Sequence, residues 1–329
     1  MKTLNRRPLM QLLAGAALAL TVHTAWSQAP SWPAAGPIKL VVPFTPGSGT
    51  DVMARVLAEK LGPALGQQVV VENKPGAGGT VGAAQVAKSA ADGYTLLVHS
   101  SGHVVNQALY PKLAYDTLKD FDGITPLASL PNVLVVSPAK GYKDVADLVS
   151  KAKARPDTMF YASAGNGSAT HMNAEQFRVV AGLKAQHVPF KGTPEALTDI
   201  MGGRTDWFFA PLVSVLPLVK DGKLQALAVG TAVRSPALPS VPSIADAGLK
   251  DAAYTFWVGM FAPAKTPRAV IDRLHAETLK VLALPDVKER LERLGATPMT
   301  MSQAAFEKFL DSETAAAAQL VKAAGIKLD

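Results

Sequence analysis

The sequence contains no cysteine. Disulfides, zinc–thiolate sites, a cysteine nucleophile and a lipid anchor on an N-terminal cysteine are therefore excluded. No stretch of apolar residues approaches the roughly 20 that a membrane-spanning helix needs. Lysine and arginine are scattered rather than clustered in a basic stripe, so we expect no nucleic-acid partner. The 329 residues are enough for two α/β domains held together by their hydrophobic cores alone.

The N-terminal segment has the pattern of an export signal. Basic residues precede an apolar stretch at positions 9–22, and Ala25-Trp26-Ser27 is a small-x-small cleavage site. We expect residues 1–27 to be removed and the protein to be periplasmic; Arg6-Arg7 leaves the general and the twin-arginine routes both open. The formal charge of +7 includes three basic and no acidic residues within 1–27, so the mature chain carries +4.

A strand, a glycine-containing loop and a helix follow one another near the start of the mature chain. Leu40–Phe44 has strand character, Thr45–Thr50 is a turn that we call the first loop, and Asp51–Lys60 has the apolar spacing of one helix face. Thr50 and Asp51 are both candidate N-caps. A helix that starts after such a loop points unpaired N–H groups and the positive end of its dipole at the space above the strand, which suits a small anion.

The same arrangement recurs about half a chain later. Met159–Ser163 is a predicted strand, Ala164–Ala169 is a loop of small residues that we call the second loop, and Thr170–Val180 is a predicted helix. Either unit alone is common α/β architecture. The pair predicts two facing loops that together bind an anion.

Two further loops come after predicted strands. The segment Ser100–His103 follows the strand Tyr94–His99, at the end where open α/β sheets bind ligands. The segment Lys191–Thr193 leads into another helix and holds the only lysine or arginine of these loops. His99 and His103 are four residues apart, but His99 ends a strand and no carboxylate lies nearby in sequence, so we predict no metal site.

Several enzyme signatures are missing. The glycine-rich turn at 76–79 has Val81 where a dinucleotide fingerprint requires glycine, and neither a phosphate loop nor an H-E-x-x-H motif occurs. Neither Ser48 nor Ser168 has the flanking glycines of a nucleophile elbow. A Ser168–His171 pair keeps a secreted serine hydrolase open as an alternative. We predict no catalysis and no cofactor.

Five blocks of sequence, in order along the mature chain, give a resemblance to a known family. They are Val41-Val42-Pro43-Phe44 with Pro46-Gly47-Ser48-Gly49-Thr50-Asp51, Val71-Glu72-Asn73-Lys74-Pro75-Gly76-Ala77-Gly78-Gly79, Asp92-Gly93-Tyr94-Thr95-Leu96-Leu97, His187-Val188-Pro189-Phe190-Lys191-Gly192 and Ala262-Pro263-Ala264-Lys265-Thr266-Pro267. The chain resembles the substrate-binding proteins of tripartite tricarboxylate transporters, also called Bug proteins.

The resemblance implies a two-domain periplasmic binding protein, type II-like, with two crossover hinge strands and a ligand cleft between the domains. It also implies capture of a small organic carboxylate (a dicarboxylate, an amino-acid-like or an aromatic acid) and its delivery to a permease of one large and one small membrane subunit. We expect domain 1 to comprise residues 28–130 and 230–329 and domain 2 residues 131–229. We also expect a monomer. A ligand-sensing adaptor of the same fold stays open as an alternative.

The ligand-binding residues that we predict combine these loops with the resemblance. Asp51 is expected to cap a helix rather than touch the ligand, and Asp206 either to contact an ammonium or hydroxyl group of the ligand or to hold a loop. Ser48 stands where the family more often has glycine. Which acid binds, and whether Trp207, Phe208, Phe209 and Trp257 line the cleft, stays open. The full set is Ser48, Gly49, Thr50, Asp51, Ser100, Ser101, Gly165, Ser168, Thr170, His171, Lys191, Gly192, Thr193 and Asp206.

Overall fold

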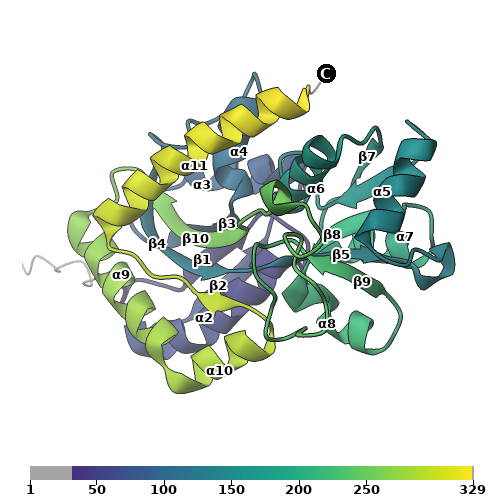
Figure 1. The fold of residues 1–329 in the computed structure, drawn as a ribbon. Coiled ribbons are helices and arrows are strands. Elements are labelled where there is room, and N and C mark those ends of the chain that lie inside the picture. Colours follow the sequence, from purple (N-terminus) through teal and green to yellow (C-terminus); the bar gives the residue numbers. More distant parts are fainter. Residues whose placement is uncertain (1–31, 328–329) are drawn as a thin grey trace, which may run out of the picture. The chain divides into compact units, whose positions relative to one another are not determined.

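The computed structural model describes residues 32–327, and the predicted export signal lies outside them. Two β-sheets, each covered by helices on both faces, make up this part of the chain (Figure 1). None of the helices between residues 32 and 327 has the length and apolarity of a bilayer span.

The first sheet has six strands in the order β11-β4-β10-β3-β1-β2. Strands β1, β2 and β3 are parallel, whereas β10 lies antiparallel between β3 and β4. The helices α2, α9 and α10 share a core on one face, and α3, α4 and α11 share a core on the other. The bounds are β1 Ile38–Val42, α2 Gly49–Leu65, β2 Val69–Asn73, α3 Thr80–Ala87, β3 Thr95–Ser100, α4 Gly102–Leu109, β4 Phe121–Ser129, β10 Trp257–Pro263, α9 Arg268–Ala283, α10 Pro285–Arg293, β11 Thr297–Pro298 and α11 Gln303–Ala324.

The second sheet has five strands in the order β7-β6-β8-β5-β9. Strands β6, β7 and β8 are parallel, and β5 runs antiparallel to both β8 and β9. Helices α5 and α6 cover one face, and α7 and α8 the other. The bounds are β5 Asn132–Val136, α5 Val145–Ala154, β6 Phe160–Ser163, α6 Ala169–Ala181, β7 Gln186–Pro189, α7 Thr193–Met201, β8 Trp207–Pro211, α8 Leu212–Lys220 and β9 Gln225–Val229.

The chain passes between the sheets where β4 leads into β5 and again where the segment after β9 leads into β10. The two crossings are joined by a hydrogen bond of 2.8 Å from Leu130 N to Phe256 O. This is the predicted two-domain fold with paired crossings. We call the part built on the six-stranded sheet the first domain and the part built on the five-stranded sheet the second domain; the exact residues at which they divide stay a prediction.

Helix α4 and strands β4 and β11 were not predicted from the sequence. Strand β4 contains Gly123 and Pro126, which disfavour a strand. The structure accommodates Pro126 at an irregularity, since the pairing with β10 shifts register between Val258 and Gly259. Helix α4 begins inside the segment that was expected to be only a loop.

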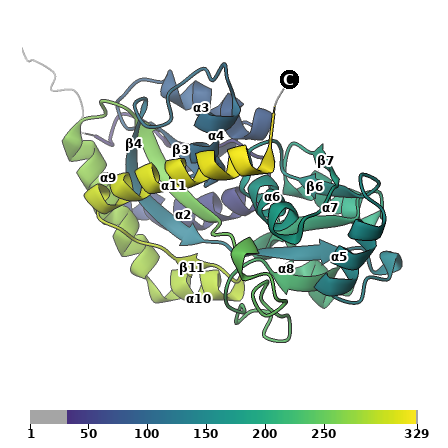
Figure 2. The same ribbon diagram turned by 45° about the horizontal axis from the view of Figure 1, so that its top comes forward.

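The large aromatic side chains that were candidates for the cleft belong to the core. Trp207, Phe208, Phe209 and Trp257 are all fully buried. Trp207 stacks on Tyr161 at 5.6 Å between ring centroids, and Trp257 packs edge-on against Phe306 of α11 at 6.1 Å. Alternation along β8 places Trp207 and Phe209 in the core shared with α5 and α6, and Phe208 in the core shared with α7 and α8. Figure 2 shows α11 running along α4 towards α6.

Candidate functional site

A cavity lies between the two domains, at the carboxyl ends of their parallel strands. Its volume is only about 10 Å³, roughly the space that holds one water molecule. We call it the interdomain cavity. It is lined by Phe44, Ser48, Gly49, Thr50, Ser100 and Phe256 from the first domain and by Ala164, Ser168, Ala169, Thr170, Thr193 and Pro211 from the second.

Helix α2 starts at this cavity, two residues earlier than the sequence suggested. Ser48 is the N-cap, not Thr50 or Asp51, which lie inside the first turn. The backbone of Ser48 is extended there (φ −66°, ψ 153°), as an N-cap requires. Among the residues that the structure describes, no acceptor is found for the amide N–H groups of Gly49 and Thr50. They are unpaired helix-start donors beside a cavity.

Asp51 stabilises the first turn of α2 through hydrogen bonds of its carboxylate. Its carboxylate accepts hydrogen bonds from the Gly47 amide (2.9 Å), from Arg55 Nε (2.9 Å) and from Asn73 Nδ2 (2.8 Å). Burial alone would raise the pKa of Asp51, but these hydrogen bonds outweigh it and hold the pKa below its usual range. Asp51 therefore binds the Gly47 amide from within the first turn rather than serving as the N-cap, and it does not line the interdomain cavity.

Helix α6 starts on the opposite wall. Ser168 is its N-cap, and the Ser168 Oγ accepts from the amide of His171 at 3.3 Å and lies 3.0 Å from Thr170 Oγ1. Thr170 Oγ1 in turn accepts from the amide of Ala164 at 2.8 Å. Within residues 32–327 the amides of Ala169 and Thr170 have no acceptor. Each domain thus presents two unpaired amides to the same cavity.

Two stacked histidines hold the second loop in shape. His171 Nδ1 accepts from the Gly167 amide at 3.1 Å, and His187 Nε2 lies 2.6 Å from Ser163 Oγ, which accepts from the Gly165 amide at 3.0 Å. The imidazole rings are 3.9 Å apart. Burial lowers the pKa of His171 to about 3 and that of His187 to about 2, so both rings are neutral near pH 7. His171 contacts the second loop through the Gly167 amide and does not line the interdomain cavity.

The two domains touch each other at the mouth of the cavity. The amide of Thr193 donates to Ser48 Oγ at 3.1 Å, Thr45 Oγ1 donates to Glu195 Oε2 at 2.9 Å, and Ser214 Oγ donates to Gly47 O at 3.1 Å. A Cβ on Gly192 would overlap Thr45 Oγ1, so this close approach requires glycine. The structure is a closed form.

The remaining predicted residues lie outside the interdomain cavity. Gly165 and Lys191 line a separate surface hollow of about 420 Å³, and Ser101 lines a cavity beside α11. Asp206 accepts from Lys140 Nζ (2.9 Å), Tyr142 Oη (3.1 Å) and the Phe160 amide (2.8 Å), which fits the loop-holding role better than ligand contact.

Five lining residues were not predicted: Phe44, Ala164, Ala169, Pro211 and Phe256. Phe44, Ala164 and Ala169 belong to the strand–loop–helix units, so the sequence did mark their positions. Pro211 and Phe256 come from β8 and the second crossing, and only the sheet order brings them to the cavity.

The geometry does not support a Ser168–His171 nucleophile pair. Ser168 Oγ contacts the backbone amide of His171, not its ring, and His171 Nδ1 is occupied by Gly167. A general base at neutral pH works best with a pKa near 7, far above that of this histidine.

Comparison with known proteins shows the family to which the chain belongs. Residues 53–326 match the model of the TctC family, described as tripartite tricarboxylate transporter family receptors. The chain belongs to this family. It is 39% identical to the "UPF0065 protein in tcbD-tcbE intergenic region" of Pseudomonas sp. (strain P51), over 87% of this chain and 85% of that one. It is 36% identical to the protein BugT of Bordetella pertussis, over 89% and 91% of the two chains.

Solved structures of similar sequence share the fold. The R. palustris protein Rpa4515, solved with adipate, is 34% identical, with a TM-score of 0.86 over 90% of this chain and 99% of that one. MatC from Rhodopseudomonas palustris, solved with bound malate, is 32% identical, with a TM-score of 0.83 over 88% and 99%. The receptor family and the two-domain periplasmic binding-protein fold predicted from the sequence are therefore confirmed.

Proposed function

We propose that this receptor captures a small organic acid with one or two carboxylates between its domains and passes it to its tripartite transporter permease. The observation that carries the proposal is the set of four unpaired amides, of Gly49, Thr50, Ala169 and Thr170, beside one cavity. Amides at helix starts bind anions through hydrogen bonds and the helix dipole. The similar proteins solved with adipate and malate hold ligands of this class.

The ligand enters only after the domains separate. A space of about 10 Å³ is too small for any of these acids. Contacts between Ser48 and Thr193 and between Thr45 and Glu195 have to break first. The acid then takes the place of the direct contact between the domains, and both helix starts bind it. Closure of the domains is thereby linked to binding of the acid.

The further parts of this proposal rest on the sequence of residues 1–27 and on family membership. We propose that residues 1–27 direct export, that the mature protein works as a monomer in the periplasm, and that it meets a large and a small membrane subunit of the permease. We propose no turnover of the ligand, since Ser168 and His171, the serine–histidine pair predicted from the sequence, have the wrong geometry.

The test is a thermal-shift screen of the mature chain with adipate, malate, succinate and aromatic acids, followed by calorimetry. An acid that binds only the native state raises the melting temperature. Ala169→Pro removes one of the four amides at the first helical position, where proline is tolerated because its N–H is unpaired in any helix. We expect a loss of affinity of about tenfold or more, typical of a hydrogen bond to a charged group.

Arg268→Pro is the matched control. Arg268 is the exposed first residue of α9, away from the interdomain cavity, and it follows a non-helical N-cap residue (Pro267, φ −52°, ψ 133°) as Ala169 does. This variant should bind the acid as the wild type does. Failure of every acid to raise the melting temperature would reject the proposal, and equal affinities of wild type and Ala169→Pro would reject the role of the amides.

A further inference from the structure

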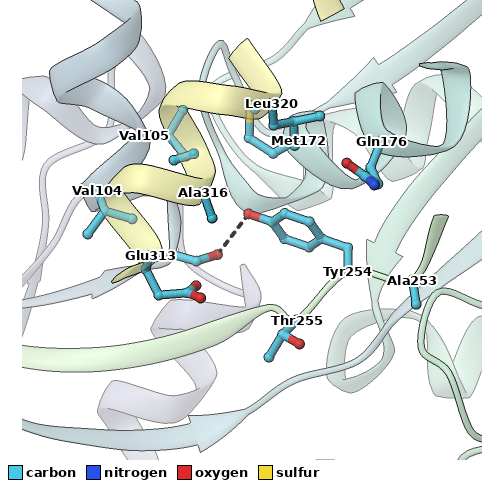
Figure 3. Close-up of a pocket in the computed structure, with 12 residues that line it drawn as sticks. Val104, Val105, Met172, Gln176, Ala253, Tyr254, Thr255, Glu313, Ala316 and Leu320 are labelled. Atoms are coloured by element: carbon cyan, nitrogen blue, oxygen red, sulfur yellow. Dashed lines mark hydrogen bonds between the residues drawn. The ribbon is translucent and has the colours of Figure 1, made fainter. Parts of the chain in front are cut away.

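A second cavity lies on the other side of the crossing segment. Its volume is about 200 Å³, comparable with a cavity that holds a benzene molecule. We call it the α11 cavity. Its walls come from the start of α4 (Ser101, Val104, Val105), from α6 (Met172, Gln176), from the crossing segment (Ala253, Tyr254, Thr255) and from α11 (Glu313, Ala316, Ala317, Leu320), as Figure 3 shows.

Neighbouring residues of two segments face opposite cavities. Ser100 lines the interdomain cavity and Ser101 the α11 cavity; Phe256 lines the former and Thr255 the latter. Helix α6 likewise contributes Thr170 to one cavity and Met172 to the other. The α11 cavity is therefore bounded by both domains, and its shape depends on how α6 is placed against α4 and α11.

The polar groups of this cavity suit a positive charge. Glu313 is the only lining residue with a formal charge, and no lysine, arginine or histidine is among them. Glu313 Oε2 accepts from Trp257 Nε1 at 2.7 Å, and among residues 32–327 the carboxylate has no ion-pair partner. Burial raises the pKa of Glu313 although the indole hydrogen bond opposes this, so a cation beside it would stabilise the ionised form.

Hydroxyl groups and apolar side chains complete the wall. Tyr254 Oη and Ser101 Oγ are hydrogen-bonded at 3.3 Å, and the ring of Tyr254 points towards α11 (Figure 3). Val104, Val105, Met172 and Leu320 supply an apolar surface. Ala316 is exposed and Glu313 is partly exposed, so the cavity is reached from solvent.

We propose that the α11 cavity binds a small organic ammonium ion, with its charge beside Glu313 and its hydrocarbon part against Val104, Val105, Met172 and Leu320. This site is separate from the interdomain cavity and has the opposite charge preference. Its chemistry does not depend on which acid binds between the domains.

Calorimetry on the mature chain with benzylammonium as probe tests the proposal. We expect saturable binding, at least tenfold weaker for benzyl alcohol, which has the same ring without the charge. Glu313→Gln keeps the shape and an oxygen acceptor for Trp257, and should weaken benzylammonium binding at least tenfold. Glu307→Gln, on an exposed position of the same helix, is the matched control and should bind like the wild type.

A second variant keeps the test decisive if Glu313→Gln alters folding. Ala317→Phe fills the space and leaves the carboxylate in place, so it should also abolish binding. Circular dichroism and melting temperature check that each variant is folded. No binding to the wild type, or equal affinities of wild type and Glu313→Gln, would overturn the proposal. Because benzylammonium is added without any acid, neither outcome bears on the proposed function of the interdomain cavity.

Discussion

The first and second loops have the same sequence pattern but are held by different interactions. Ser48 and Ser168 are both helix N-caps with nearly the same backbone angles. Ser168 Oγ caps its own helix, whereas Ser48 Oγ makes no cap bond and accepts from Thr193 of the other domain. Behind them, the first loop is held by the carboxylate of Asp51 and the second by the neutral ring of His171. The serine at a helix start can therefore cap its own helix, as Ser168 does, or bind a residue distant in sequence, as Ser48 does.

The largest effect that we expect is a loss of stability at low pH. The two loops are held by groups of different pKa, so their contributions to stability are lost at different pH values. The pKa of His171 is about 3 in the folded protein and near 6.5 when unfolded. Between these two pH values the unfolded state binds more protons than the folded state. The contribution of His171 to the free energy of unfolding is therefore complete above about pH 6.5 and is lost as the pH falls towards 3. His187 behaves in the same way, whereas the contribution of Asp51 is lost only below its unfolded pKa of about 4. The free energy of unfolding, measured with urea, should fall by about 2 to 5 kcal/mol between pH 6.5 and 4.5.

His103 provides the control for this pH dependence. It is fully buried, its pKa is also lowered by burial, and neither ring nitrogen has a partner among the described residues. His103→Phe should keep the packing against Phe121 and Phe261 and make the pH dependence of stability less steep, while the part due to His171 and His187 remains. A stability that is constant from pH 6.5 to 4.5 would show that the buried histidines do not hold the second loop.

Gly192 tests the dependence of the first loop on the other domain. Its φ of −173° is open to any residue, so a substitution there changes only the available space. In Gly192→Ala the new methyl group would overlap Thr45 Oγ1 and come within 2.9 Å of Ser48 Oγ, which prevents closure. We expect acid affinity to fall about 100-fold, or about 3 kcal/mol, with little change in melting temperature without ligand. Gly36→Ala, where a Cβ meets nothing within 4 Å, is the control; equal acid affinities of wild type and Gly192→Ala would contradict the closed form seen here.

The smallest effect that we expect is the difference in stability between alanine variants of Ser168 and Ser48. Ser168→Ala removes a cap bond and should reduce the free energy of unfolding by about 1 kcal/mol. Ser48→Ala removes only the contact to Thr193, so its effect without ligand should stay within about 0.5 kcal/mol. Chemical denaturation of both variants measures the difference. Equal losses of stability would mean that the two serines play the same role.

Much of the fold was predictable because its signals are local. The predicted strand Met159–Ser163 and helix Thr170–Val180 correspond to β6 (Phe160–Ser163) and α6 (Ala169–Ala181), and the predicted strand Tyr94–His99 corresponds to β3 (Thr95–Ser100). The failures have local causes as well: β4 carries a glycine and a proline, and α4 is a short helix that begins directly after a strand. Within the site, the lining residues Ser48, Gly49, Thr50, Ser100, Ser168, Thr170 and Thr193 were all predicted from the loops that follow strands.

The sequence by itself determined the strand–loop–helix units and the family, because periodicity, glycine positions and helix starts depend on residues close together in the chain. Only the tertiary structure decided which partner each polar group has. Ser48 and Thr193 are 145 residues apart in sequence, and Lys140 and Asp206 are 66 apart. Such pairs follow from the order of strands in the two sheets and from the closure of the domains, which no short stretch of sequence encodes.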